Sequence, residues 1–330
     1  MTNFENNESR IKEIIAWLSK LGEIETLPKT LRLASSDASF RKYFRVNKKE
    51  NGSLIIMDAP PEKESIQSFI KVTEIFEKIG LNVPKIFEKN LNKGFLLLTD
   101  FGKNNFHDSL NKQNFYRLYL NAIDILIKLQ LSSKKNILPE YSKSYFFEEL
   151  LLFEKWYLEV HLKIYLSDEQ KKELYNIFEY ILEVCDSQSK VYVHKDYHSR
   201  NLMILTNQNI GILDHQDAVF GPITYDLVSL LKDVYIETHE EIILDMSIRY
   251  WEKARYVGLP INEDFDLFYK NFEIVGIQRH LKILGIFCRL NYRDGKNNYL
   301  RYVNFILNSI KKVCLRYPEF FSLLKILDSK

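Results

Sequence analysis

The chain of 330 residues carries 46 Lys and Arg against 44 Asp and Glu, so its formal net charge is only +2. This balance gives no whole-molecule attraction to nucleic acid or to an acidic membrane surface, although local basic patches remain possible. The first twenty residues lack the apolar core of a signal peptide, and no later run reaches the length of a membrane span. We therefore expect a cytoplasmic protein that needs no nucleic acid, membrane or obligate protein partner.

Three cysteines, Cys185, Cys288 and Cys314, lie far apart without a C-x-x-C spacing. This pattern favours buried small apolar residues in a reducing compartment over a disulfide framework or a zinc site. The hydrophobic content of 46% is ample for a large buried core.

The first hundred residues combine helical and β-rich segments. Apolar residues at helical spacing predict an amphipathic helix over residues 8–21 and a second helix over residues 62–79, which Gly80 ends. Residues of high β propensity predict strands in five segments: 31–33, 40–46, 54–57, 84–87 and 94–98.

From Ser109 onward the chain is mostly helical. Helical periodicity recurs in seven segments: 110–131, 145–160, 168–185, 225–235, 239–256, 264–284 and 297–313. The many Tyr and Phe residues in this half are expected to line the core rather than to form a cofactor site. The order of elements predicts an α+β protein, with an antiparallel sheet first and helices afterwards.

Residues 191–214 interrupt the helical pattern with short apolar runs around a polar loop. The run 191–193 leads into His194–Asn201, and the runs 202–205 and 210–213 predict a hairpin that ends at Asp214. Asp196 and Asn201 match the kinase catalytic-loop pattern H-x-D-x-x-x-x-N, and Asp214 takes the place of the kinase metal aspartate. Phosphoryl transfer needs these groups, because a carboxylate orients the attacking hydroxyl and oxygen ligands hold Mg²⁺ on ATP. Either carboxylate alone would suit a buried structural role, but the three positions together favour a kinase.

The same stretch carries a family resemblance. Residues 194–203 (HKDYHSRNLM), 214–218 (DHQDA), 221–222 (GP) and 225–233 together resemble the AmgK-type anomeric sugar kinases of the aminoglycoside phosphotransferase family. Similar matches lie toward both ends of the chain: 37–41, 57–61, 278–290 and 292–296. The resemblance implies a bilobal protein-kinase-like fold that uses ATP and Mg²⁺. It also implies an amino-sugar acceptor, N-acetylmuramate or N-acetylglucosamine, phosphorylated during cell-wall recycling.

The resemblance also places two lobes, an N-terminal nucleotide-binding lobe over residues 1–102 and a C-terminal catalytic lobe over residues 103–330. Leu98 and Asp100 fall at the expected interlobe hinge, where backbone groups would meet adenine. Asp100-Phe101-Gly102 spells the kinase D-F-G motif but precedes the catalytic loop, so the metal is assigned to Asn201 and Asp214 instead.

The sequence departs from the kinase pattern at two segments that bind the ATP phosphates in kinases. The loop 35–39 stands where kinases cover the phosphates but has no glycine, so Ser36 and Ser39 are expected to let backbone N–H groups approach them. An ordinary hairpin turn is the alternative. Residues 54–58 lack the third-strand lysine of kinases. Arg41 or Arg45 is expected to replace it, unless both are solvated strand residues.

The remaining site predictions concern the catalytic loop and the acceptor. Asp196 is expected to act as the base, while His194 and Asp226 hold the loop; zinc at His194 and His198 is disfavoured, because no cysteine accompanies them. Acceptor contacts are expected from five residues: His198, Arg200, Gln216, Arg279 and Arg293. Either of the last two would pair with the carboxylate of N-acetylmuramate, and a solvated helix face is the alternative.

Two other functions remain open from the sequence. One is a kinase for another small hydroxyl compound, such as an aminoglycoside or choline, which would need an acidic acceptor pocket. The other is a non-catalytic ATP-binding regulatory protein, which the missing lysine and the glycine-free loop suggest. Intact Asp196, Asn201 and Asp214 count against this second alternative.

Overall fold

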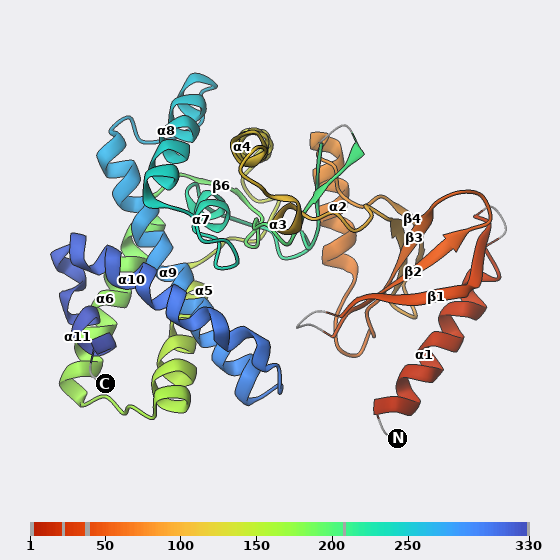
Figure 1. Cartoon of the computed structure of the whole chain (residues 1–330), viewed down its shortest axis with the longest axis horizontal. Coiled ribbons are helices and arrows are strands. Elements are labelled where there is room, and N and C mark those ends of the chain that lie inside the picture. Colours follow the sequence, from red (N-terminus) through yellow and green to blue (C-terminus); the bar gives the residue numbers. More distant parts are fainter. Residues whose placement is uncertain (1–2, 22–23, 37–39, 207–208, 329–330) are drawn as a thin grey trace. The chain divides into compact units, whose positions relative to one another are not determined.

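The computed structural model describes residues 3–21, 24–36, 40–206 and 209–328. Contacts divide the chain into two compact units (Figure 1): unit 1 contains Met1–Asn104 and Met203–Gln216, and unit 2 contains Asn105–Leu202 and Asp217–Lys330. Within the described ranges, no helix is both long and apolar enough to cross a membrane.

Unit 1 is built on a five-stranded antiparallel sheet with the strand order β1-β2-β3-β5-β4. Its strands are β1 (Thr26–Ser36), β2 (Lys42–Lys48), β3 (Ser53–Asp58), β4 (Ile86–Asn90) and β5 (Phe95–Thr99). In the register of the central strands, Ile55 of β3 pairs with Arg45 of β2 and with Leu98 of β5. The end of β2, the start of β3 and the end of β5 therefore lie side by side, with Asn47 paired to Ser53 and Thr99 paired to Leu54.

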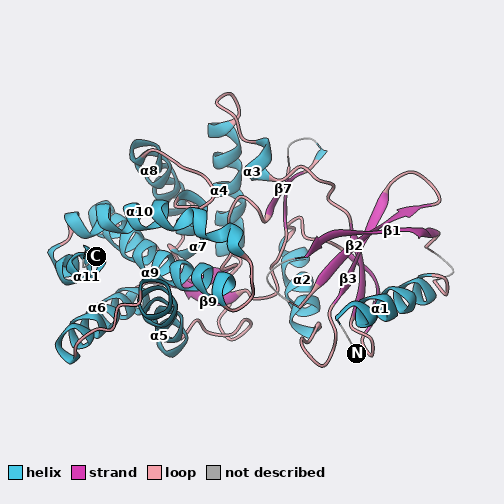
Figure 2. Ribbon diagram, turned by 60° about the horizontal axis from the view of Figure 1, so that its bottom comes forward, coloured by secondary structure: helices cyan, strands magenta, loops and turns pink. Residues whose placement is uncertain are grey.

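A helix packs on each face of this sheet (Figure 2). On one face, Ile14 and Leu18 of α1 (Asn3–Leu18) pack with β-strand residues that include Phe95 and Leu97. On the other, Phe69 and Ile70 of α2 (Gln67–Ile79) pack with residues that include Leu96 and Leu98. Alternate residues of β5 thus point to opposite faces, and both faces are buried because the run is continuously apolar.

The hairpin that follows residues 194–201 belongs mainly to unit 1. Its strands β7 (Leu202–Ile204) and β8 (Ile210–Ile212) pair with each other. Asn82 fixes the hairpin, since its carbonyl accepts from the N–H of Ile212 at 2.8 Å and its side chain donates to Ile210 O at 3.1 Å. Gly211 is required here, because a Cβ at this position would lie 2.7 Å from the ring of Phe101.

Unit 2 is mainly helical. Its elements in chain order are α3 (Phe106–Ser109), α4 (Phe115–Leu131), α5 (Lys143–Leu152), the π-helix η1 (Phe153–Leu162), α6 (Asp168–Ser187), β6 (Lys190–Val193), β9 (Val219–Pro222), α7 (Tyr225–Leu231), α8 (Glu240–Tyr256), α9 (Phe265–Tyr292), the 3₁₀-helix η3 (Asn297–Tyr302), α10 (Val303–Arg316), the 3₁₀-helix η4 (Pro318–Phe320) and α11 (Phe321–Asp328). Helix α9 forms the centre, because every residue from 272 to 285 is buried. Strands β6 and β9 pair antiparallel, and β6 ends at Val193, directly before residues 194–201.

The α+β class, with a small antiparallel sheet followed by a mainly helical part, is confirmed, and the elements differ from expectation mostly at their ends. The helix predicted over 62–79 begins only at Gln67, because the N–H groups of Lys63 and Glu64 form a turn with Pro60 O. The helix predicted over 110–131 begins at Phe115, because side chains of Asn111 and Asn114 bind the backbone before it.

In unit 2, the helix predicted over 145–160 becomes α5 followed by η1. The change occurs where the backbone of α9 passes close to α5: a Cβ on Gly285 would lie 2.3 Å from the carbonyl carbon of Leu152. The helix predicted over 225–235 ends at Leu231, and the one predicted over 264–284 continues to Tyr292. Strand β9 and helix α11 were not predicted, since their segments are short.

Candidate active site

Two buried carboxylates anchor the backbone of the loop His194–Asn201 in unit 2. Asp226, at the start of α7, accepts from the N–H of His194 at 2.6 Å and of Lys195 at 3.0 Å. Asp233 accepts from the N–H of Ser199 at 2.9 Å. Burial raises the pKa of Asp226 to about 7, and the two N–H groups oppose that rise. The loop conformation is therefore determined by side chains more than thirty residues further along the chain.

Lys195 adopts a backbone conformation that is rare for a residue with a side chain. Its φ is +76°, in the left-handed region that usually requires glycine. Its carbonyl accepts from Arg279 Nη1 at 2.6 Å and from Ser229 Oγ at 3.2 Å, and its Nζ donates to Tyr145 OH at 3.1 Å. Such strain persists only where surrounding contacts determine it, and it is common at functional sites.

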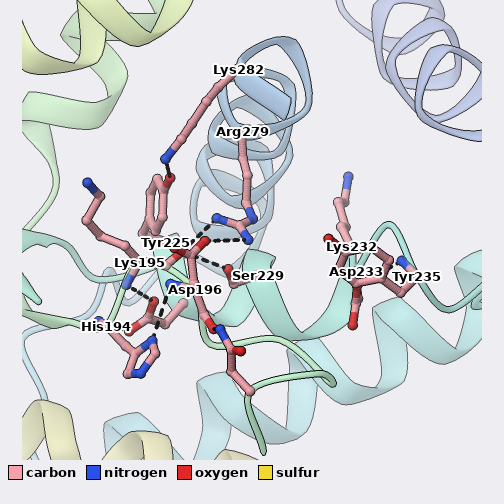
Figure 3. Close-up of polar contacts among 12 residues, drawn as sticks. His194, Lys195, Asp196, Tyr225, Ser229, Lys232, Asp233, Tyr235, Arg279 and Lys282 are labelled. Atoms are coloured by element: carbon pink, nitrogen blue, oxygen red, sulfur yellow. Dashed lines mark hydrogen bonds and ion pairs between the residues drawn. The ribbon is translucent and has the colours of Figure 1, made fainter. Parts of the chain in front are cut away.

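Asp196 follows directly, with its backbone held, its side chain beside Arg279 (Figure 3) and its carboxylate partly exposed. Its carbonyl accepts from Asn201 Nδ2 at 3.0 Å, Arg279 Nη2 lies 3.4 Å from Oδ1, and the side chain is 41% exposed. Burial opposes ionisation of Asp196, but the charges of Arg279 and Lys282 outweigh burial and hold its pKa well below the ordinary range. Asp196 is thus a fixed, ionised carboxylate that can accept a hydrogen bond from a hydroxyl group.

A buried charge cluster supports the loop from behind. Glu149 of α5 lies 2.8 Å from Lys282 Nζ and 3.7 Å from Lys195 Nζ, and it accepts from Tyr141 OH at 2.6 Å. We call this set the loop cluster; it contains three cations and three carboxylates: Lys195, Arg279, Lys282, Glu149, Asp196 and Asp226. No role was predicted for Glu149, Lys195 or Lys282. The sequence offers little to single out Glu149, because Glu148 stands directly before it in α5.

The expected metal ligands Asn201 and Asp214 lie in different units. Asn201 in unit 2 donates through its amide nitrogen to Asp196 O, which leaves the amide oxygen as the atom offered to a cation. Asp214 in unit 1 follows β8 with a φ of +57°, and its Oδ1 accepts from Gln216 Nε2 at 2.7 Å. Carboxylate and amide oxygens are ligands that Mg²⁺ prefers, so the donor chemistry fits this metal. Gln216, which was expected to contact the acceptor, donates to Asp214.

In unit 1, both candidate phosphate-binding arginines form ion pairs. Arg41 Nε lies 3.1 Å from Glu64 Oε2. Arg45 binds Asp100 with two hydrogen bonds of 2.5 and 2.9 Å and also donates to Gly102 O. At the end of β3, where kinases carry lysine, the buried Asp58 pairs with Arg10 of α1.

The other residues predicted to contact the nucleotide lie in two different strands or outside the described residues. Leu98 lies in β5 with its side chain in the core against α2. Ser36 ends β1, and Ser39 lies outside the described residues.

The Arg45–Asp100 pair leads to a prediction about stability. Burial opposes ionisation of Asp100, but hydrogen bonds from Arg45, Ser53 and Gly102 N–H outweigh it and lower the pKa from its ordinary value of 3.8. Replacing Asp100 by Asn should lower the free energy of unfolding by about 2 kcal/mol, between the values for exposed and buried pairs.

Because the folded-state pKa is depressed, this contribution is present above the unfolded pKa and is lost as the pH falls through the folded value. Urea unfolding of both proteins should therefore show a constant difference at neutral pH that shrinks below about pH 4. A difference that grew on acidification would contradict the assignment.

The acceptor candidates separate into two groups. His198 and Arg200 lie on the loop: the His198 ring packs edge-on against Tyr235, and the Arg200 guanidinium stacks 3.6 Å from the Tyr235 ring centroid. Burial lowers the pKa of His198, which favours the neutral imidazole. Arg279 belongs to the same group, because its Nη2 contacts Oδ1 of Asp196 on this loop. Arg293 lies apart at the exposed C-terminal end of α9, where it pairs with Asp294 at 2.8 Å.

His194 is fully buried, and its Nδ1 lies 3.3 Å from the N–H of Asp196. Seven of the residues singled out from the sequence therefore meet around one loop of unit 2: His194, Asp196, His198, Arg200, Asn201, Asp226 and Arg279.

Known proteins resemble the chain in sequence. Residues 30–259 match the profile of the phosphotransferase enzyme family (APH). A protein from Neisseria meningitidis serogroup B, named N-acetylmuramate/N-acetylglucosamine kinase, is 42% identical over 301 residues, which cover 90% of this chain and 89% of that protein. A protein of the same name from Pseudomonas aeruginosa is 38% identical over 332 residues, with 98% of each chain covered.

Solved structures resemble it in fold. The choline kinase LicA from Streptococcus pneumoniae superposes with a TM-score of 0.66 at 14% identity, covering 93% of this chain and 99% of that one. The ADP-bound aminoglycoside phosphotransferase APH(2'')-Ib gives a TM-score of 0.60 at 16% identity, covering 91% and 98%. At these identities the likeness concerns the fold alone.

Proposed function

Because the chain belongs to the phosphotransferase enzyme family, we propose that it transfers the γ-phosphoryl group of ATP to the anomeric hydroxyl of N-acetylmuramate or N-acetylglucosamine. The names of the relatives from Neisseria meningitidis and Pseudomonas aeruginosa support this acceptor class. Cytoplasmic recycling of cell-wall sugars is the setting in which such an activity would serve.

The observation that carries the proposal is the ionised, accessible carboxylate of Asp196 on an anchored loop. Asp196 orients the acceptor hydroxyl and takes its proton as the hydroxyl oxygen bonds to the γ-phosphorus. The bond from that phosphorus to the β,γ-bridging oxygen breaks, and ADP leaves. Little covalent chemistry falls to the protein, so positioning and charge stabilisation supply most of the rate.

In this proposal, Asn201 and Asp214 hold Mg²⁺ through oxygen atoms. When bound, the metal neutralises negative charge on the ATP phosphates. Arg41, Ser36 and Ser39 remain proposed nucleotide contacts, as do Leu98 and Asp100 after β5. The double hydrogen bond from Arg45 to Asp100 favours a structural role for Arg45 over direct phosphate binding.

The loop cluster bears on the alternative acceptors. Arg279 reaches Asp196 directly, and Arg200 lies on the same loop. The carboxylates of Glu149 and Asp196 are already paired with Lys282 and Arg279, so neither is free to bind a polycationic aminoglycoside or a choline cation, whereas a neutral or anionic sugar needs no free carboxylate. The cluster therefore favours the amino-sugar acceptor.

A panel of acceptors tests the proposal. The protein is incubated with radiolabelled ATP and Mg²⁺ and with N-acetylmuramate, N-acetylglucosamine, kanamycin, choline or no acceptor. We expect labelled product with the amino sugars only, and an acid-labile phosphate at the anomeric carbon. Labelling of kanamycin or choline alone would replace the proposed acceptor, and no ATP turnover with any acceptor would favour a regulatory protein.

A further inference from the structure

Helix α9 presents a row of cations on the side that faces the catalytic loop. Arg279, Lys282, Ile286, Arg289 and Arg293 follow one another at intervals of three or four residues, so they share one side of the helix. All residues from 272 to 285 are buried, and Ile286 and Arg289 are the first partly exposed members of the row beyond them. The row begins at Asp196, which Arg279 contacts, and leads away from it.

Three of the four cations in this row have a partner. Arg279 binds Lys195 O and Asp196, Lys282 binds Glu149, and Arg293 binds Asp294 with a side chain that is 56% exposed. Arg289 differs from them. Its Nε is buried without a hydrogen-bond partner, and its guanidinium forms no ion pair with any residue that the structure describes.

Without a ligand, the partial burial of the Arg289 guanidinium is unfavourable in free energy. Burial lowers the pKa of Arg289, the charge of Arg293 lowers it further, and Asp294 offsets this only in part. Arginine nevertheless stays protonated at neutral pH, so a partly buried positive charge remains without compensation. The loop cluster cannot supply it, because Asp196 is already paired with Arg279 and Glu149 with Lys282 and Lys195. The buried Nε of Arg289 is a donor that an acceptor atom of a bound ligand could complete.

We propose that Arg289 binds the carboxylate of an anionic amino-sugar acceptor and thereby sets the preference for a sugar acid over a neutral sugar. The proposal rests on the proposed function and names the acceptor contact within it. Arg279 and Arg293, the two candidates from the sequence, are already occupied by carboxylates of the protein.

The spacing along α9 suits this role. At about 1.5 Å per residue, the Cα of Arg289 lies about 15 Å along the axis from that of Arg279. Side chains on a helix lean toward its N-terminus, so Arg279 and Arg289 lean the same way and stay about 15 Å apart along the axis, a span that Asp196 and an acceptor bound to it can cover together. Asp196 with Arg279 and the guanidinium of Arg289 can thus bind opposite ends of one acceptor. The planar guanidinium also suits two parallel hydrogen bonds to a carboxylate.

The test changes the enzyme and the substrate together. We compare kcat/KM for N-acetylmuramate, its uncharged carboxamide derivative and N-acetylglucosamine, in the unmodified protein and in Arg289→Met. In the unmodified protein the acid should exceed the carboxamide roughly ten- to a hundredfold, as for loss of one charge-assisted hydrogen bond. In Arg289→Met this preference should disappear, while N-acetylglucosamine is affected much less.

Two further variants sharpen the result. Arg249→Met, which removes an exposed arginine of α8 paired with Asp245, is the control for loss of a surface charge and should keep all three rates. Arg289→Lys keeps the charge without the planar fork and should retain part of the preference. The acid-to-carboxamide ratio within one protein cancels any loss of folded enzyme.

The outcomes distinguish a failure of the proposed function from a failure of the inference about Arg289. If the unmodified protein phosphorylates no amino sugar, the proposed function fails. If it phosphorylates them but does not prefer the acid over the carboxamide, Arg289 has no carboxylate to bind and the inference is overturned. The inference is also overturned if Arg293→Met, and not Arg289→Met, abolishes the preference. If Arg289→Met does not fold, the acid-to-carboxamide ratio in Arg289→Lys decides.

Discussion

Asp196→Asn is expected to lower kcat by roughly 10²–10⁴, the range for loss of a general base. The amide keeps the size of the side chain and an oxygen for Arg279 Nη2, which lies 3.4 Å from Oδ1, but it cannot take the acceptor proton. The backbone of the loop is held by Asp226 and Asp233 and by Asn201 Nδ2, none of which the change removes. Nucleotide binding should therefore stay close to that of the unmodified protein.

The measurement combines steady-state kinetics with calorimetric titration of ATP. Asp245→Asn serves as the matched control, because it removes a carboxylate of α8 that pairs only with its helical neighbour Arg249 in the described part of the chain. The control should retain full turnover. Near-normal turnover of Asp196→Asn would remove Asp196 from the role of base.

Asp214→Asn is expected to abolish turnover and to weaken ATP binding in the presence of Mg²⁺. The change replaces a charged oxygen ligand by a neutral one, and Mg²⁺ depends strongly on carboxylate ligands. The hydrogen bond from Gln216 Nε2 to Oδ1 can persist with the amide oxygen, so the local fold after β8 should survive. ATP affinity measured over a range of Mg²⁺ concentrations should lose most of its dependence on the metal.

Asp100→Asn is the matched comparison, since Asp100 heads the sequence Asp100-Phe101-Gly102 that imitates the kinase metal motif. Its carboxylate is already bound by Arg45, Ser53 Oγ and Gly102 N–H. This variant should lose stability, as described above, and keep its Mg²⁺ dependence. An exchange of phenotypes between Asp214→Asn and Asp100→Asn would show that the metal had been assigned to the wrong aspartate.

The elements that the sequence predicted best are those with strong local signals. The run 94–98 is continuously apolar and forms β5, and Gly80 ends α2 with a φ of +77°. Hairpin β7–β8 was predicted from two apolar runs around a polar turn and is confirmed. Helix ends were predicted less well, because side chains such as those of Asn111 and Asn114 bind backbone groups that a helix would otherwise use.

The sequence by itself determined the class of fold and the residues that are contiguous in the motif. Asp196 and Asn201 belong to one short loop, so their separation in the chain also keeps them close in space. The hydrogen bond from Asn201 Nδ2 to Asp196 O is consistent with this. Helical periodicity likewise placed Arg279 in a helix over residues 264–284, with Arg293 beyond its predicted end. It could not say what covers the polar side of that helix.

The tertiary structure alone decided which of these groups are already paired. Arg45 and Asp100 are 55 residues apart, and Asp196 and Arg279 are 83 apart, yet each pair is in contact. A charged residue in an apolar segment has the same sequence signature whether a carboxylate, solvent or a ligand satisfies it. Only packing distinguishes these cases, because the partner comes from a distant segment, as Glu149 does for Lys282. The same physical reason leaves Arg289, one arginine among several in the sequence, as the cation of α9 that the described residues do not neutralise.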